Sequence, residues 1–334
     1  MIRTLVYPLH DLLPYVNWIY FFHAWGMAPR FAQIAEVHDC TACRRAWVES
    51  MGESDRQQAA EAEKLHREAI SLVRELDGKY AVSARFGLFP ACSEEDDIIV
   101  MVSDNRDNDN IKQKGKGTYK EVRLPFLRQQ QLQPREDVFL CLADFIAPRG
   151  MHPHVLTDIP DFPRGKSQPR GTAIGMFATA VDGRMEQLYA DDDYRRMLVQ
   201  TISDRMAEAA AEKMHEDIRR VYWGYAPEEK FAPKELFSEK YEGRRPAVGY
   251  PSIPDQSFNF LIDDIIGMGT IGIELTSNGM MQPHAAVSGL IFDHPAACHF
   301  AVGAIDEEQC ADYSRRRGFP VEEMRKYLAA NLKK

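Results

Sequence analysis

The chain has no excess of positive charge and no long uninterrupted apolar run. Its 334 residues carry 41 Lys and Arg against 50 Asp and Glu, a formal net charge of −9. Nucleic-acid binding relies on clustered cations that neutralise phosphates, so this balance argues against a nucleic-acid partner. Residues 12–28 lack full charges, but Pro14, Asn17 and Gly26 interrupt them, which argues against a membrane span.

Cysteine is sparse and scattered along the chain. Six cysteines in a chain of this length indicate reduced thiols in a cytoplasmic protein, not a disulfide framework. The N-terminus carries only Arg3 as a cation, which does not fit a secretory signal. We therefore expect a cytoplasmic protein with no membrane partner.

The sequence also lacks a G-x-G-x-x-G fingerprint and the strict alternation of strands and helices of a dinucleotide-binding fold. It contains no internal repeat and no long low-complexity linker. We therefore expect one domain over residues 1–334. Since 45% of the residues are hydrophobic, the chain is ample for a packed core.

Helical periodicity is clearest over residues 191–222, where apolar side chains recur near the helical repeat. Winding this helix puts Asp204, Glu208 and His215 on a stripe beside the apolar one, the geometry of a helix that lines a cleft. Four shorter helices are predicted at 11–25, 54–76, 306–317 and 320–332. Gly318 is expected to be a left-handed C-cap.

Extended apolar segments alternate with turn signals elsewhere in the chain. Strands are predicted at 86–91, 98–102, 138–147, 173–180, 271–275, 289–292 and 299–305. Residues 104–120 and 149–170 are predicted to be surface loops, and 226–254 to be irregular. Strands at both ends with long helices between them predict an α+β fold, a twisted, largely antiparallel sheet flanked by long helices.

Seven short sequences follow one another in an order that is informative as a set. They are GLFPA at 87–91, CLADF at 141–145, DRMAE at 204–208, VYWGYAP at 221–227, RPAVGYP at 245–251, VSG at 287–289 and RRRG at 315–318. Together they resemble the C-terminal activation domain of cobalamin-dependent methionine synthase. The resemblance runs from about Tyr15 to Leu332.

The resemblance implies a role in methionine biosynthesis. The family's domain uses S-adenosylmethionine to re-methylate oxidised cobalamin, which a partner domain carries, while a flavodoxin-like protein supplies the electron. The homocysteine, folate and cobalamin modules have no room in this chain, which would therefore be a separate subunit or an excised domain. It would be part of a methyltransferase and unable to make methionine alone.

The family's Arg-x-x-x-Gly-Tyr motif is complete here as Arg245, Gly249 and Tyr250. A guanidinium can grip the carboxylate of S-adenosylmethionine with two parallel hydrogen bonds. Gly249 would let backbone approach the ligand, backbone groups near Ala247 could bond the adenine edge, and Tyr250 would face the corrin. From the residues alone, a capping arginine and a packed tyrosine remain an alternative.

Two carboxylates of the long helix also match the family. Glu208 aligns with the acidic ligand of the ammonium group, although a surface carboxylate is its plain alternative. Asp204, one turn earlier, matches the acid that receives the axial histidine displaced from cobalamin. Holding that imidazole would favour the base-off state and so bias the conformational equilibrium.

The sequence departs from the family at two places in the ligand site. The family has an aspartate where this chain has Asn17, and a Tyr-Tyr pair where this chain has His299 and Phe300. Asn17 can accept a hydrogen bond but carries no charge. We therefore expect weaker ligand binding, and a docking or regulatory module that has lost the ligand is the alternative.

Cys40 and Cys43 form a C-x-x-C with His38 two residues before it. Such a group could ligate zinc or act as a redox pair. No second pair stands at zinc-ribbon spacing, and the segment has no counterpart in the family pattern. The sequence therefore favours incidental thiols and no metal site, with a metal-dependent protein as a third alternative.

Overall fold

The computed structural model describes residues 1–103, 119–132, 137–151 and 169–333. Its centre is a six-stranded antiparallel sheet in the order β4-β3-β2-β5-β8, with β1 also paired to β2. The strands are β1 (Ile2–Pro8), β2 (Ala81–Glu94), β3 (Asp97–Ser103), β4 (Tyr119–Pro125), β5 (Ala173–Val181) and β8 (Ala286–Ile291). A two-stranded sheet joins β6 (Glu274–Leu275) to β7 (Met281–Gln282). The predicted α+β class and antiparallel sheet are confirmed.

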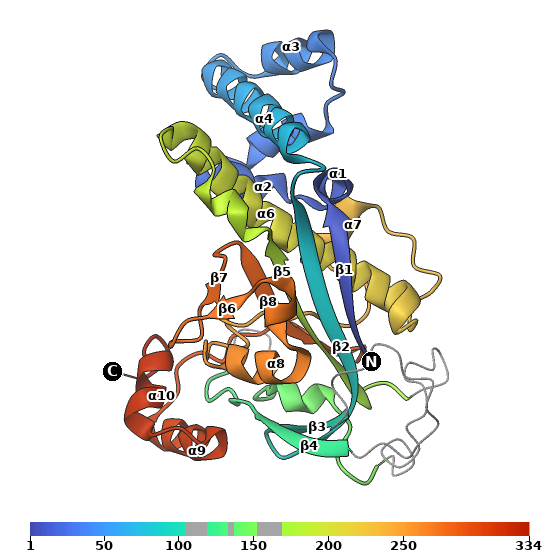
Figure 1. Ribbon diagram of the computed structural model, residues 1–334, viewed down its shortest axis with the longest axis vertical. Helices are drawn as coiled ribbons and strands as arrows, with labels where there is room; N and C mark the ends of the chain where they lie inside the picture. Colours follow the sequence, from blue (N-terminus) through green and yellow to red (C-terminus); the bar gives the residue numbers. More distant parts are fainter. Residues whose placement is uncertain (104–118, 133–136, 152–168, 334) are drawn as a thin grey trace.

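The long strand β2 organises the sheet (Figure 1). It pairs with β1 along its first half and with β5 along most of its length, and it turns into the hairpin with β3 at its end. Every residue of β5 is buried, because both faces of this central strand are covered. Phe177 belongs to the core beneath the long helices, while its neighbour Met176 belongs to the core on the opposite face.

Helices cover the sheet and extend beyond it. Near the N-terminus lie α1 (Leu9–Leu12), α2 (Trp18–Ala24), α3 (Thr41–Ser50) and α4 (Arg56–Leu76); after β5 come α6 (Asp193–Asp217), α7 (Pro233–Leu236), α8 (Phe258–Ile266), α9 (Glu307–Arg317) and α10 (Val321–Tyr327). Helix α6 contacts β2, β5 and β8 and runs on into a π-helical turn, Ile218–Tyr222. The α3–α4 pair lies at one end of the molecule, away from α9 and α10 (Figure 1).

Most predicted helices and strands are found, and three predicted strands are wrong in whole or part. Residues 138–147 hold a short 3-10 helix, Leu142–Phe145, because Asp144 accepts the backbone N–H of Cys141 at 2.8 Å and closes a helical turn. Residues 299–305 form no strand; Ser252 instead holds the backbone of Phe300. Within 271–275 only Glu274–Leu275 pairs, since Gly272 has a φ of 80°.

Other differences concern element boundaries. Strand β1 and helix α8 were not predicted, because β1 shows no strict alternation of apolar and polar residues and α8 spans only nine residues, too few for a helical period to stand out. The predicted helix at 11–25 is broken between a 3-10 turn, Leu13–Tyr15, and α2. Gly318 has a φ of 75°, as its C-cap role requires.

The two predicted surface loops fall largely on residues 104–118 and 152–168, outside the described residues. Tyr119 and Lys120, at the end of the first predicted loop, belong to β4. Among the described helices, none combines the length and the apolar character needed to cross a membrane.

Candidate functional site

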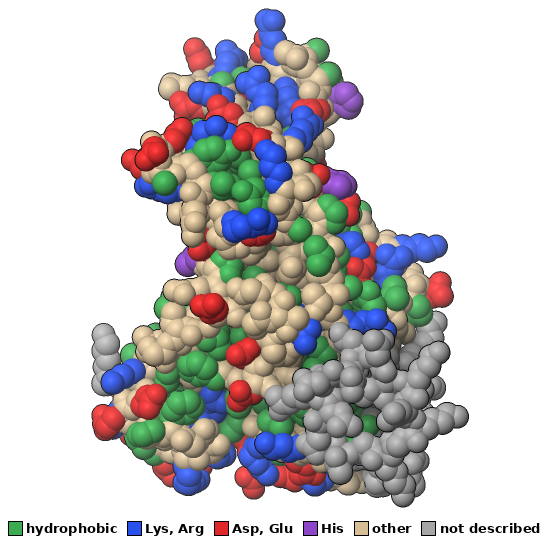
Figure 2. Space-filling model, viewed as in Figure 1, with side chains coloured by type: hydrophobic (Ala, Val, Ile, Leu, Met, Phe, Trp, Pro, Cys, Tyr) green, Lys and Arg blue, Asp and Glu red, His purple; other side chains and the backbone are tan. Residues whose placement is uncertain are grey.

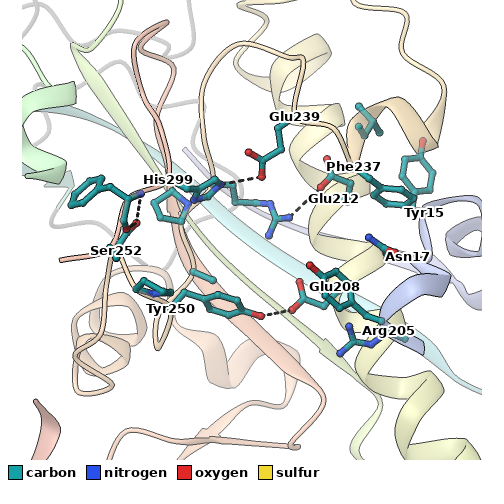
Figure 3. A pocket seen from close by; sticks show the side chains of 18 residues that line it. Tyr15, Asn17, Arg205, Glu208, Glu212, Phe237, Glu239, Tyr250, Ser252 and His299 are labelled. Atoms are coloured by element: carbon teal, nitrogen blue, oxygen red, sulfur yellow. Dashed lines mark hydrogen bonds and ion pairs between the residues drawn. The ribbon is translucent and has the colours of Figure 1, made fainter. Parts of the chain in front are cut away.

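A cavity of about 770 Å³ opens between α6, the turn leading into α2, and the irregular chain around residues 236–252 and 299–301. Its size lies in the range of sites for small organic ligands. The wall combines the aromatic rings of Tyr15, Tyr20 and Phe237 with charged groups from α6 and from the chain after α7 (Figure 3). The cavity thus offers flat apolar faces beside several ionisable side chains.

Helix α6 contributes an acidic row to the cavity. Glu208 and Glu212 stand one turn apart on the stripe of α6 that lines the cavity, and Arg205 lies beside them. Burial raises the pKa of Glu212, and Arg245 partly offsets this effect. Other faces of α6 pack against the sheet and the N-terminal helices.

Arg245 faces Glu212 across the cavity wall. One guanidinium nitrogen lies 3.3 Å from Oε2 of Glu212, and both side chains are about nine-tenths buried. Nε of Arg245 and Oε1 of Glu212 have no hydrogen-bond partner among the residues that the structure describes. Buried polar atoms rarely stay unpaired, so this pair retains bonding capacity for a polar ligand.

The position of Arg245 is fixed by an extra stretch of chain along β8. Residues 244–248 pair irregularly with this strand, with backbone bridges from Arg244 to Phe292 and from Ala247 to Gly289. A Cβ on Gly289 would lie 2.3 Å from the carbonyl oxygen of Pro246, so only glycine permits this approach. The rigid sheet thereby sets where the guanidinium enters the cavity.

Tyr250 and Glu208 point toward one another from opposite sides of the cavity (Figure 3). The tyrosine hydroxyl donates to Oε1 of Glu208 at 3.0 Å. The negative charge of Glu208, together with partial burial, raises the pKa of Tyr250 to about 12. The hydroxyl therefore stays protonated and occupies one oxygen of the carboxylate, while Tyr250 as a residue remains 53% exposed.

A second contact between polar side chains lies in another part of the wall. Nε2 of His299 lies 3.2 Å from Oε1 of Glu239, and the hydrogen bond from His299 lowers the pKa of Glu239. The next residue, Phe300, is buried at the wall. His299 and Phe300 are the two positions at which the resemblance implied a Tyr-Tyr pair, and both of them line this cavity.

The structure brings seven of the nine predicted site residues to this one cavity. They are Asn17, Glu208, Arg245, Ala247, Tyr250, His299 and Phe300. Asn17 is also the N-cap of α2, where its Oδ1 accepts the N–H of Ile19 at 3.2 Å. The acceptor oxygen that the sequence assigned to a ligand therefore already has a partner.

Asp204 and Gly249 do not line the cavity. Gly249 has a φ of 85°, and a Cβ there would lie 2.8 Å from Oε1 of Gln256, so its glycine serves the turn itself. Asp204 lies one turn before Glu208, and its carboxylate is 3.5 Å from Nδ1 of the exposed His284. Burial raises the pKa of Asp204, with His284 acting in the opposite sense.

His215 does not share the cleft-lining stripe that the helical projection predicted. It is fully buried and meets the ring of Tyr241 edge-on at a centroid distance of 5.2 Å. Burial, reinforced by Arg219, holds the pKa of this histidine well below its usual range. The cavity ends before this turn of α6, so the helical projection alone could not separate cavity-lining positions from core positions.

Two acidic residues of the cavity, Glu212 and Glu239, were not predicted from the sequence. Glu212 was detectable, because Asp204, Glu208 and Glu212 repeat every four residues along α6. Glu239 follows α7 in an irregular segment, where no periodicity marks a residue. Only the folded chain brings it to His299.

The fold and the cavity define the structural class of the protein. It is an α+β domain with a polar cavity between one long helix and the edge of an antiparallel sheet. Residues 8–318 match the family described as vitamin B12 dependent methionine synthase, activation domain. The chain is also similar to a crystal structure of the MetH reactivation domain bound to AdoHcy, at 30% sequence identity and a TM-score of 0.77. That similarity covers 100% of this chain and 91% of the other. The chain belongs to the activation-domain family of vitamin B12-dependent methionine synthase.

Proposed function

We propose that the cavity binds S-adenosylmethionine and that the chain supports the reductive methylation of cob(II)alamin on a cobalamin-binding partner domain. When bound, the sulfonium supplies the methyl group, so that one electron and one methyl convert cob(II)alamin to methylcobalamin and leave S-adenosylhomocysteine. A flavodoxin-like protein would supply the electron. The observation that carries the proposal is the shared cavity of Arg245, Glu208 and Glu212.

Arg245 is the anchor for the amino-acid end of the ligand. Its unpaired Nε and its fork of donors suit a carboxylate, and Glu212 behind it keeps the guanidinium in place. Glu208 is the partner for the ammonium group, which must displace the hydroxyl of Tyr250 to reach the carboxylate. The aromatic rings at the wall and the backbone near Ala247 remain for the adenosine.

Tyr250 and Asp204 would act toward the corrin carrier. The exposed ring of Tyr250, freed from Glu208, offers a flat face at the mouth of the cavity. Asp204 lies outside the cavity on the same helix and already has an imidazole 3.5 Å away, which supports a role in receiving the displaced axial histidine. We propose the same single domain for residues 1–334, acting in the cytoplasm and unable to make methionine alone.

A docking or regulatory module without a ligand is the second candidate. Two contacts favour it. The side-chain oxygen of Asn17 already caps α2, and His299 and Glu239 already bind one another, so these groups are less free to bind a ligand. In that case Tyr250 would stay on Glu208, and the domain would contribute only its surface to the methyltransferase.

Calorimetry with S-adenosylmethionine separates the two candidates. The wild type should bind with one site per chain, and Arg245→Ala should lose most of the affinity. Arg184→Ala, which removes an exposed arginine paired with Asp182, is the matched control and should bind as the wild type does. Absence of binding at millimolar ligand would favour the docking module.

A second assay tests the reaction itself. The protein is mixed with a cobalamin-binding domain, a reductant and S-adenosylmethionine, and methylcobalamin formation is followed by its absorbance. The proposal expects faster formation with the wild type than with Arg245→Ala. Equal rates with and without the protein would contradict the reactivation role, whatever the result of calorimetry.

A further inference from the structure

Three metal-ligand atoms come together at the start of α3, far along the chain from the cavity residues of α6. Within the described residues, His38, Cys40 and Cys43 each offer a ligand atom, and these atoms all lie within 4.8 Å of one another. A tetrahedral zinc ion with bonds of about 2.0–2.3 Å requires ligand atoms at about 3–4 Å from each other. Small side-chain rotations therefore suffice to close the cluster around one ion.

Cys40 is held in place at the start of α3. It is the N-cap of this helix, and its Sγ accepts the backbone N–H of Cys43 at 3.3 Å. This hydrogen bond fixes the direction of the sulfur relative to the helix, so the sulfur is oriented before any metal binds.

Ion pairs with α3 and α4 hold the segment that carries the three ligands. Asp39, between His38 and Cys40, is bonded by Arg44 at 3.1 Å and by Arg74 of α4 at 3.2 Å. The side chain of Arg44 is buried and also donates to Nδ1 of His66 on α4. Because these contacts tie the ligand loop to the α3–α4 pair, little chain entropy remains to be lost on metal binding.

The cluster is accessible to ions in solution. His38 and Cys43 are exposed, and Cys40 is half-buried. The α3–α4 pair forms one end of the molecule (Figure 1), and charged side chains of both signs gather over it on the face shown in Figure 2. An ion can therefore enter without any movement of the core.

We propose that His38, Cys40 and Cys43 form a binding site for a zinc-type divalent cation, with water as the fourth ligand. From spacing alone, the sequence favoured incidental thiols, because it shows no second C-x-x-C pair. The structure supplies the third ligand from the histidine that precedes the pair. Two sulfurs and one imidazole nitrogen select zinc over magnesium or calcium, which prefer oxygen.

The rival occupant of this motif is a disulfide between Cys40 and Cys43. A disulfide needs only the two thiols, so the contribution of His38 to metal affinity separates the two interpretations. The test uses the full chain, reduced and freed of metal by a chelator. It is titrated with Zn²⁺ against a chromogenic competitor and, separately, with Co²⁺ for its thiolate charge-transfer and tetrahedral d–d bands.

The proposal expects one zinc per chain and a cobalt spectrum typical of a tetrahedral site with two sulfurs. Cys40→Ser, Cys43→Ser and His38→Ala should each weaken zinc binding at least about tenfold. Cys298→Ser, a half-buried cysteine elsewhere in the chain, is the matched control and should bind zinc as the wild type does. Circular dichroism of each variant checks that α3 and the core remain folded.

Three results would overturn the inference. The first is zinc binding that is absent, or equally weak in the wild type and the cysteine variants. The second is an unchanged affinity in His38→Ala, which would leave a dithiol without its third ligand. The third is a Cys40–Cys43 disulfide that forms as fast with one equivalent of zinc as without it.

Discussion

Arg245 and Glu212 form an ion pair of 3.3 Å in the cavity wall, and within the described part of the chain each keeps one polar atom without a hydrogen-bond partner. An ion pair this deeply buried stabilises the fold only while both partners are present. The polar atoms of the pair that are still able to form hydrogen bonds lie where the carboxylate of an amino-acid ligand would be bound. The pair therefore has two separable roles, one in stability and one in recognition.

Substitutions at this pair should separate those roles. Arg245→Ala should destabilise the protein by about 3 kcal/mol, because it leaves Glu212 buried without a cation, and should weaken S-adenosylmethionine binding by about 100-fold. The double variant Arg245→Met with Glu212→Gln should recover most of the stability and none of the affinity. Denaturant unfolding and calorimetry measure the two effects; joint recovery of both would contradict a direct ligand contact.

Tyr250→Phe should tighten ligand binding. The substitution removes the hydroxyl that occupies Glu208 and keeps the aromatic ring, so the ammonium group no longer displaces a hydrogen bond worth about 1 kcal/mol. Calorimetry should show an affinity about five times higher than that of the wild type. A tenfold loss would mean that the hydroxyl contacts the ligand itself.

Asn17→Asp should also tighten binding, by restoring a negative charge near the ammonium group. Aspartate is as good an N-cap as asparagine, so the stability of α2 should not change. The gain should shrink at high salt, because the cavity mouth is open to solvent. Asn17→Ala is the control: it should cost about 1 kcal/mol of stability without any gain in affinity.

Asp204→Asn should slow methylcobalamin formation with the cobalamin domain while leaving S-adenosylmethionine affinity nearly unchanged. Asp204 lies outside the cavity, and its present partner is the imidazole of His284 at 3.5 Å. His284→Ala should accelerate the same step, since it removes an internal competitor for that carboxylate. If Asp204→Asn lowered the rate of methylcobalamin formation and the affinity for S-adenosylmethionine equally, a role of Asp204 separate from ligand binding would be contradicted.

Stability should fall between about pH 6.5 and pH 4 because of His66. Burial first, and then the positive charge of Arg44, lower the pKa of His66 from 6.5 to about 4. The unfolded chain thus takes up a proton in this range that the folded chain does not, and stability is complete only above the unfolded pKa. The loss should reach about 3 kcal/mol at pH 4.

His66→Gln is the matched variant for this pH effect. Glutamine retains a polar side chain that can accept from Arg44, but it does not titrate. Its free energy of unfolding should vary less over the same pH range than that of the wild type. Identical pH profiles would assign the acid loss to other groups.

The sequence predicted the α+β class, the antiparallel sheet and the long helix α6 because each rests on local periodicity. It could not predict how residues 299–305 are used. Their apolar run has the composition of a strand, but Ser252, some fifty residues away, binds the backbone of Phe300 in place of a strand partner. Side-chain capping of this kind depends on tertiary contacts that no local pattern reveals.

The residues of the candidate site, too, were predicted only where a local motif marks them. Arg245, Glu208 and Tyr250 were found through motifs of the family, and the fold brings them to one cavity. Glu239 was not found, because only the three-dimensional arrangement brings it to His299. His215 was predicted to line the cleft but is buried in the core. A helical projection gives the direction of a side chain around the axis of α6, but it does not show which part of the protein packs in that direction.

The most direct test of the central claim is a crystal structure of the protein with S-adenosylhomocysteine or S-adenosylmethionine. The account predicts ligand density in the cavity, with its carboxylate on the guanidinium of Arg245, its ammonium on Glu208 and the hydroxyl of Tyr250 turned away. An empty cavity at millimolar ligand, or a ligand bound elsewhere with Tyr250 still on Glu208, would contradict it.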